Sequence, residues 1–149
     1  WTLEIIGAGS EKDKDRIVGF AKEYSCEKQF RLLPYTDDIA PAYQKASIFA
    51  LCSRYEGFGL VLTEAMSQGC ASIAADYKGR QSEIITDGVN GLLCPVEDFY
   101  AIANKLEMLI NNGSLRRKLQ INGIERSKDF LVEGYAQRME VLLEHLRHK

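Results

Sequence analysis

The sequence predicts an α/β fold, with a parallel sheet flanked by helices and extra helices at the C-terminal end. Short apolar runs alternate with helical patterns, as expected where crossover helices join parallel strands. Apolar residues make up 46% of the 149 residues, which suits a single domain over residues 1–149 with one sizeable core. After the last apolar run only helical periodicity remains, which accounts for the C-terminal helices.

Each element follows from its local pattern. Strands are predicted at residues 2–6, 29–33, 47–52, 71–74 and 91–94. Helices are predicted between them at residues 11–24, 38–46, 60–68 and 81–86. The first helix is expected to bury Ile17, Phe20, Ala21 and Tyr24. Gly69 is expected to end the helix at residues 60–68 as a left-handed cap.

The C-terminal third is predicted to be helical. Asp98 is expected to cap a helix that buries Ile102, Leu106, Leu109 and Ile110. Ser114 is expected to cap the next helix, which runs through Leu115 and Leu119. A terminal amphipathic helix is predicted over residues 132–147, with an apolar stripe of Tyr135, Met139, Leu142, Leu143 and Leu146. This stripe either joins the core or stays exposed, and an exposed stripe would favour self-association.

Charge and cysteine content exclude several function classes. The 19 basic and 21 acidic residues give a net charge of -2, so no broad field favours nucleic acid or anionic lipid. No apolar run reaches the length of a membrane span. Four cysteines and two histidines occur without metal-ligand spacing, so no metal site is expected. Three cysteines lie in or beside predicted strands, which favours buried free thiols and a cytoplasmic location.

The residues that carry the functional signal run from Glu56 to Glu64. They follow a buried strand and lead into a helix, so Glu56 lies in the strand-to-helix loop and Glu64 about one turn into the helix. Gly57 and Gly59 let backbone N–H groups approach a diphosphate, and the helix dipole adds partial positive charge there. Each carboxylate can accept two hydrogen bonds from vicinal hydroxyls. This pattern suits a nucleotide-sugar.

Other interpretations of these signals fit less well. Ser53 and Glu56 match a capping box, and Glu64 could be an ordinary helical glutamate, but two glycines in the first turns would disfavour a helix from Ser53. The Gly7-Ala8-Gly9 run lacks the third glycine of the dinucleotide fingerprint, which argues against NAD. A carboxylate pair could serve glycoside hydrolysis, but acids around a phosphate-binding turn fit a donor site better.

The motif Ser53-x-x-Glu56-Gly57-Phe58-Gly59-Leu60-x-x-x-Glu64-Ala65-Met66-x-x-Gly69 is more specific than its parts. Downstream lies Gly79-x-x-x-Glu83-Ile84-Ile85-x-Asp87-Gly88-x-Asn90-Gly91-Leu92. Together they resemble the C-terminal donor-binding domain of retaining GT-B glycosyltransferases of family 4, over essentially the whole chain. The resemblance implies a Rossmann-like parallel sheet, the C-terminal half of a GT-B fold. It also implies metal-independent, cofactor-free hexosyl transfer from a UDP-, GDP- or ADP-sugar to an acceptor hydroxyl.

The resemblance also implies a role for each site residue. Glu56, the catalytic candidate, would meet hydroxyls of the donor sugar. The backbone of Gly57, Phe58, Gly59 and Leu60 would meet sugar and diphosphate. Glu64 would hold the ribose. The loop of Pro34 and Tyr35 would border the nucleobase.

Several positions depart from the family pattern. Pro34 stands where glycine is usual and removes an N–H donor, which leaves base recognition open. Ser82 replaces a frequent proline, and Lys78 precedes Gly79 where a small residue is common. The loop at residues 76–82 is therefore expected to meet the donor sugar differently.

The family's cationic anchors and N-terminal GT-B domain are missing, so the chain is expected to be an N-terminally truncated piece, inactive alone. The full protein could associate peripherally with membrane. The alternative is a non-catalytic α/β interaction domain with an idle ligand site.

Overall fold

The computed structural model describes residues 1–147 and divides into two compact units. The first spans Trp1–Ile39 and the second begins at Ala40. Both contain parallel strands flanked by helices, so the predicted α/β class is confirmed. The prediction of a single domain over residues 1–149 stays a prediction.

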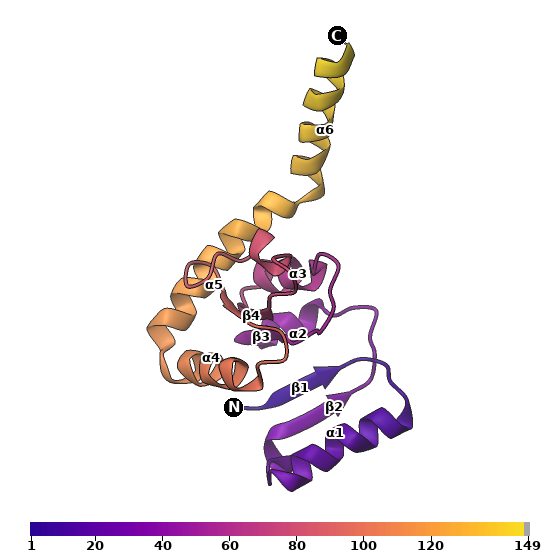
Figure 1. The fold of residues 1–149 in the computed structure, drawn as a ribbon, viewed down its shortest axis with the longest axis vertical. Helices are drawn as coiled ribbons and strands as arrows, with labels where there is room; N and C mark the ends of the chain where they lie inside the picture. Colours follow the sequence, from indigo (N-terminus) through magenta and orange to yellow (C-terminus); the bar gives the residue numbers. More distant parts are fainter. Residues whose placement is uncertain (148–149) are drawn as a thin grey trace. The chain divides into compact units, whose positions relative to one another are not determined.

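The N-terminal unit is a small strand–helix–strand motif. Strands β1 (Leu3–Ile6) and β2 (Phe30–Leu33) pair in parallel, with Leu3 opposite Phe30, and are joined by α1 (Glu11–Glu23) and the 3-10 turn η1 (Glu27–Gln29) (Figure 1). Ser10 caps α1 by accepting a hydrogen bond from the Asp13 N–H at 3.2 Å.

The burial predicted for α1 is partly wrong. Ala21 is buried, but Phe20 is 53% and Tyr24 73% exposed. The reason lies in the size of the sheet in this unit. Two strands offer α1 too narrow a surface to cover its whole apolar stripe.

The C-terminal unit contains a three-stranded parallel sheet of order β3-β4-β5, formed by Ile48–Leu51, Ala71–Ala75 and Leu92–Cys94. Ile48 pairs with Ala71, and Ile73 with Leu92. Around it lie α2 (Ala40–Lys45), α3 (Leu60–Ser67), the 3-10 turn η2 (Gln81–Glu83), α4 (Phe99–Asn111) and α5 (Gly113–Ser127) (Figure 1). The predicted strands agree with these bounds within one residue. The helix expected at residues 81–86 is shorter, a single 3-10 turn.

Strand β4 is buried along its whole length because helices cover both faces of the sheet. On one face Ile73 packs with Ile102 and Leu109 of α4 and Leu119 of α5. On the other face Ala74 packs with residues of α3 and of the segment after η2, namely Leu62, Met66, Ile84 and Ile85. The helix α3, which carries the second half of the motif, is therefore held by an apolar core.

The helix caps agree with the sequence in all but one case. The Asp98 carboxylate accepts from the Ala101 N–H at 2.8 Å, as predicted for α4. The prediction of Ser114 as the next cap is wrong. Helix α5 begins at Gly113, and the Asn112 side chain accepts from the Leu115 N–H at 2.9 Å. Because α4 ends at Asn111, Asn112 closes one helix and opens the next.

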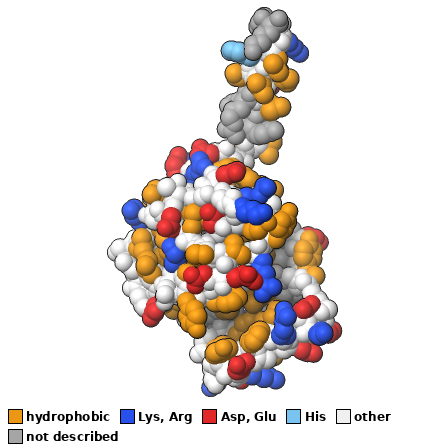
Figure 2. All heavy atoms as spheres, in the orientation of Figure 1, with side chains coloured by type: hydrophobic (Ala, Val, Ile, Leu, Met, Phe, Trp, Pro, Cys, Tyr) orange, Lys and Arg blue, Asp and Glu red, His pale blue; other side chains and the backbone are white. Residues whose placement is uncertain are grey.

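The C-terminal segment continues through the 3-10 turn η3 (Lys128–Phe130) into α6 (Val132–Arg147), which has the predicted bounds. Met139, Leu142, Leu143 and Leu146 of the predicted stripe are exposed. Figure 2 shows hydrophobic side chains along this helix. Of the two alternatives for the stripe, exposure is the one observed for these four residues.

The four cysteines are unpaired, with Cys70 and Cys94 buried, Cys26 half-buried and Cys52 exposed. The expectation of buried thiols therefore fails at Cys52, because β3 ends one residue earlier and leaves it in the following loop. Within residues 1–147, no helix combines the length and apolarity needed to cross a bilayer.

Candidate functional site

The motif lies where the sequence places it, between a buried strand and a helix. Strand β3 ends at Leu51, residues 52–59 form an irregular turn, and α3 starts at Leu60. Glu56 lies in this turn and Glu64 in the second turn of α3. No helix starts at Ser53, so the capping-box interpretation is excluded. The turn follows the carboxyl end of a parallel strand, where open α/β sheets bind ligands.

Gly59 is the residue that shapes the start of α3. It has a left-handed conformation, with φ 87°, and the helix has no side-chain cap at this end. A Cβ at Gly59 would lie 3.4 Å from Leu62 Cδ1 and 3.5 Å from Leu51 Cδ2. These are ordinary van der Waals distances, so it is the positive φ and not crowding that favours glycine here. The first amides of α3 are left without the side-chain acceptor that caps α1, α4 and α5.

Gly57 differs from Gly59 in its surroundings. A Cβ at Gly57 would meet no atom within 4 Å, so no intramolecular packing requires glycine. The open space is consistent with the predicted close approach of a ligand. The peptide groups on both sides of Gly57 are held by side chains. Its N–H donates to Glu56 Oε1 at 2.9 Å, and its carbonyl accepts from Arg80 Nη1 at 3.2 Å.

Glu64 is exposed on α3 and lies near a buried tyrosine. Tyr43 of α2 is buried and packs edge-on against Phe49, with ring centroids 5.5 Å apart. Burial raises the pKa of Tyr43, and the negative charge of Glu64 raises it further. The Glu64 carboxylate is thus accessible to solvent and lies near the Tyr43 phenol, which its raised pKa keeps neutral.

Phe58 and Leu60, the remaining motif residues, differ in how their side chains are placed. Phe58 is 36% exposed, and its ring lies 5.7 Å from that of Phe130. Leu60 is exposed, and its carbonyl accepts from the Thr63 hydroxyl at 2.8 Å. Phe58 therefore anchors the turn, while the backbone of Leu60 begins the helix.

A second loop, residues 76–83, borders this turn. Asp76 Oδ1 accepts from the N–H groups of Gln81, at 3.0 Å, and Ser82, at 3.2 Å. Gln81 Oε1 accepts from the Tyr77 N–H at 2.8 Å. The Gln81 Nε2 atom is buried without a hydrogen-bond partner, 3.6 Å from where a Cβ of Gly59 would lie. Hydrogen bonds among its own residues thus organise the loop beside the start of α3.

Sequence reasoning missed Arg80 and Gln81 as neighbours of the motif. Position 80 carries no periodic or motif signal of its own, and Gln81 is separated from Gly59 by more than twenty residues. The signals in this loop were the motif residues Gly79 and Glu83 and the departures noted at Lys78 and Ser82, and none of them pointed to Arg80 or Gln81. Lys78 has a positive φ of 52°, which a lysine rarely adopts.

Pro34 and Tyr35 belong to the N-terminal unit, directly after β2. Tyr35 is 64% exposed. Their part in binding a nucleobase stays a prediction, as do the roles given to Glu56 and Glu64.

Comparison with known proteins agrees with the fold and the motif. A family profile, glycosyl transferases group 1, matches residues 1–126. An uncharacterized glycosyltransferase of Haemophilus influenzae is 28% identical over 143 residues, which cover 96% of this chain and 40% of that protein. The chain thus spans about two fifths of the length of this curated relative.

Solved structures give the same picture. The C-terminal domain of a glycosyl transferase group 1 family protein from Francisella tularensis superposes with a TM-score of 0.81 at 33% identity, covering 89% of this chain and 71% of that domain. A mutant of S. aureus TarM, crystallised with fondaparinux, alpha-GlcNAc-glycerol and UDP, gives a TM-score of 0.82 at 27% identity. That match covers 95% of this chain and 28% of TarM. The chain therefore belongs to the glycosyl transferases group 1 family and has the fold of the C-terminal half of a GT-B enzyme.

Proposed function

We propose that this chain is the donor-binding domain of a retaining family 4 glycosyltransferase that moves a hexosyl group from a nucleoside diphosphate sugar to an acceptor hydroxyl. The observation that carries the proposal is the start of α3. A left-handed glycine opens this helix without a side-chain cap, between two glutamates that can accept hydrogen bonds from hydroxyls.

Each motif residue then has a role in holding the donor. The N-terminal amides of α3 donate to the diphosphate, and the helix dipole favours its charge. Glu64 accepts from the two ribose hydroxyls. Glu56 contacts the sugar hydroxyls, and its present hydrogen bond with the Gly57 N–H keeps it beside the turn. Pro34 and Tyr35 border the nucleobase.

The complete enzyme needs parts that this sequence does not contain. In this proposal an N-terminal GT-B domain supplies the acceptor site, and this chain alone does not catalyse transfer. The reaction requires neither metal nor cofactor. The four unpaired cysteines favour a cytoplasmic location, and peripheral membrane association of the full protein is compatible with this proposal. UDP in the TarM complex makes a uridine nucleotide the first to test.

Ligand-observed saturation-transfer NMR with UDP-, GDP- and ADP-sugars tests the proposal. We expect one nucleotide to bind selectively. Glu64→Ala should weaken its binding by about 1.5 to 3 kcal/mol, the scale of a hydrogen bond to a charged group. Glu107→Ala removes an exposed helical glutamate from α4 and should leave the affinity unchanged.

Two results would contradict the proposal. Equal affinity in wild type and Glu64→Ala would remove the ribose role of Glu64. No binding of any donor, by a chain with a native circular dichroism spectrum, would favour the non-catalytic interaction domain.

A further inference from the structure

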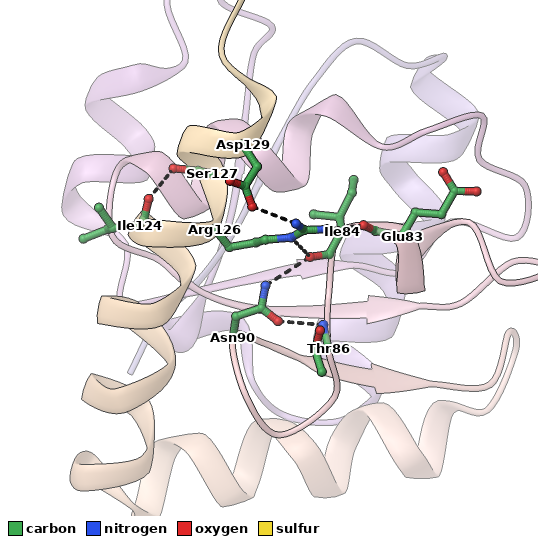
Figure 3. Close-up of polar contacts among 8 residues, drawn as sticks. All are labelled: Glu83, Ile84, Thr86, Asn90, Ile124, Arg126, Ser127 and Asp129. Atoms are coloured by element: carbon green, nitrogen blue, oxygen red, sulfur yellow. Dashed lines mark hydrogen bonds and ion pairs between the residues drawn. The ribbon is translucent and has the colours of Figure 1, made fainter. Parts of the chain in front are cut away.

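The side chain of Arg126 joins helix α5 to the end of the second loop of the candidate site. Its Nη2 donates to the Glu83 carbonyl at 2.6 Å and its Nε to the Ile84 carbonyl at 3.1 Å. Asp129 holds Nη1 at 2.7 Å (Figure 3). Glu83 is the last residue of η2, so the guanidinium caps the carbonyl end of the loop that carries Arg80 and Gln81.

Asn90 fixes the same carbonyl from the other side. Its Nδ2 donates to the Ile84 carbonyl at 3.0 Å, and its Oδ1 accepts from the Thr86 N–H at 2.6 Å (Figure 3). Asn90 is buried. The segment after η2 is therefore held by two side chains, one from the turn before β5 and one from α5.

Arg126 also contacts an aromatic residue that reaches the motif. The guanidinium carbon lies 4.7 Å from the ring centroid of Phe130, within the range of a cation–π interaction. The Phe130 ring in turn lies 5.7 Å from that of Phe58, in an edge-on arrangement. Phe130 packs against the cluster that contains Leu62 and Met66 of α3.

The two loops of the candidate site are joined directly by the hydrogen bond from Arg80 to the Gly57 carbonyl, and Arg126 and Phe130 link them by a second route. Arg126 binds the loop at residues 76–83, and Phe130 contacts the motif turn at Phe58. We infer that Arg126 and Phe130 are positioning residues that hold the two loops in a fixed position relative to each other. That this relative position fits the donor rests on the proposed function.

Arg116 provides a comparison on the same helix. It donates to the carbonyls of Leu109 and Ile110 at the end of α4, so it too caps a carbonyl end. Those carbonyls precede the connection between α4 and α5 and belong to neither loop of the site. If both arginines served stability alone, replacing either one would have the same effect on the motif turn. If Arg126 is a positioning residue, only its replacement should affect the motif turn.

Hydrogen–deuterium exchange of the ligand-free chain separates these possibilities. In Arg126→Met we expect exchange to speed up at least about fivefold in peptides covering residues 81–86 and also in those covering residues 55–61. Arg116→Met should speed exchange near residues 108–112 and leave residues 55–61 as in wild type. Acceleration of residues 81–86 alone in Arg126→Met would overturn the inference.

Substitutions of Phe130 keep the test decisive if Arg126→Met does not fold. Phe130→Leu retains apolar volume but removes the ring that links Arg126 to Phe58, and it should speed exchange at residues 55–61. Phe130→Tyr keeps the ring, so its exchange at residues 55–61 should be the same as in wild type. Unchanged exchange at residues 55–61 in Phe130→Leu would overturn the inference equally.

Titration with UDP tests whether the relative position of the loops matters to the ligand. If wild type binds UDP, we expect Arg126→Met to lower the UDP affinity about tenfold, because displaced loops misplace the groups that contact the nucleotide. Arg116→Met should bind UDP as wild type does. Wild-type affinity in an Arg126→Met chain with accelerated exchange would overturn the positioning role. If wild type binds no nucleotide, the proposed function fails, and the exchange data still decide whether the two loops are coupled.

Discussion

Gly59 and Gly69 flank helix α3, and both have left-handed backbones, with φ of 87° and 86°. At Gly69 this conformation closes the helix. The Gly69 N–H donates to Met66 and the Cys70 N–H to Ala65, each at 3.0 Å, which satisfies the last carbonyls. At Gly59 the same conformation starts a helix whose first amides have no side-chain cap.

The contrast shows how one local feature serves two purposes. The C-terminal end of α3 is sealed, and the Cys70 Sγ atom contacts the Tyr43 and Ala46 carbonyls at 3.3 and 3.6 Å. The N-terminal end lies beside exposed residues and an open space at Gly57. One end completes its hydrogen bonds within the protein, and the other is suited to a ligand. Four experiments test this difference.

The largest expected effect on nucleotide affinity comes from a negative charge at the N-terminal end of α3. Gly59→Asp places a carboxylate where the diphosphate is proposed to bind, and aspartate tolerates a left-handed backbone better than most residues. We expect UDP affinity to fall by about a hundredfold, since like charges in contact cost several kcal/mol. Gly69→Asp is the matched control. Equal loss of affinity in both variants, measured by isothermal titration calorimetry, would mean that the N-terminal end is not special.

The sealed end should be sensitive to alkaline pH. Burial raises the pKa of the Cys70 thiol from its ordinary value of 9.0 to about 11, and the unfolded chain titrates near the ordinary value. Between these values the unfolded chain loses the proton first, so the free energy of unfolding decreases as pH rises. The loss attributable to Cys70 is on the order of 2 kcal/mol.

Urea denaturation of wild type and Cys70→Ser at several pH values checks this effect. Serine keeps a hydroxyl near the Tyr43 carbonyl but does not ionise in this range. The difference between the two stability curves should shrink by that amount from pH 8 to 11. Parallel curves would show that Cys70 is not protected by burial.

Gly57 tests whether the open space is used. A Cβ there meets no protein atom within 4 Å, so Gly57→Ala should leave the melting temperature unchanged. If the donor occupies the space, its affinity should fall about fivefold, because close backbone approach is lost. Gly19→Ala, also in open space, is the control for the substitution itself. Donor binding at wild-type strength by Gly57→Ala would place the ligand elsewhere.

The smallest effect concerns a polar side chain at the sealed end. Ser67 Oγ donates to the Glu64 carbonyl at 2.7 Å on an exposed face of α3. Ser67→Ala should change the free energy of unfolding by less than about 0.5 kcal/mol, as expected for surface substitutions, and should leave nucleotide affinity unchanged. A marked loss of affinity would show that the two ends of α3 are coupled.

Local sequence patterns predicted most of the elements because they depend on neighbours in the chain. The strand that became β3 could be recognised by its continuous apolar run, and the cap at Asp98 by its position before a periodic stripe. Where two local signals competed, as at Asn112 and Ser114, the sequence alone gave the wrong cap. Asn112 is the cap of α5 because α4 ends directly before it and α5 begins directly after it.

The candidate site was only partly predictable, because local patterns reveal residues that are close in the sequence but not contacts between distant segments. Glu56, Gly59 and Glu64 lie within nine residues, so their spacing placed them on one turn and one helix. Arg80 lies more than twenty residues from Gly57, and its hydrogen bond to that carbonyl depends on how the second loop packs.

The sequence by itself therefore determined the α/β class, the order of elements and the position of the motif, because apolar periodicity and glycine conformations act locally. Only the tertiary structure decided which neighbours the motif has: Arg80 and Gln81 beside the turn, and Phe130 against Phe58. It also decided the exposure of Phe20 and, in α6, of Met139, Leu142, Leu143 and Leu146. These features depend on packing between distant segments, and a core fixes that packing through shape and volume, which no local pattern encodes.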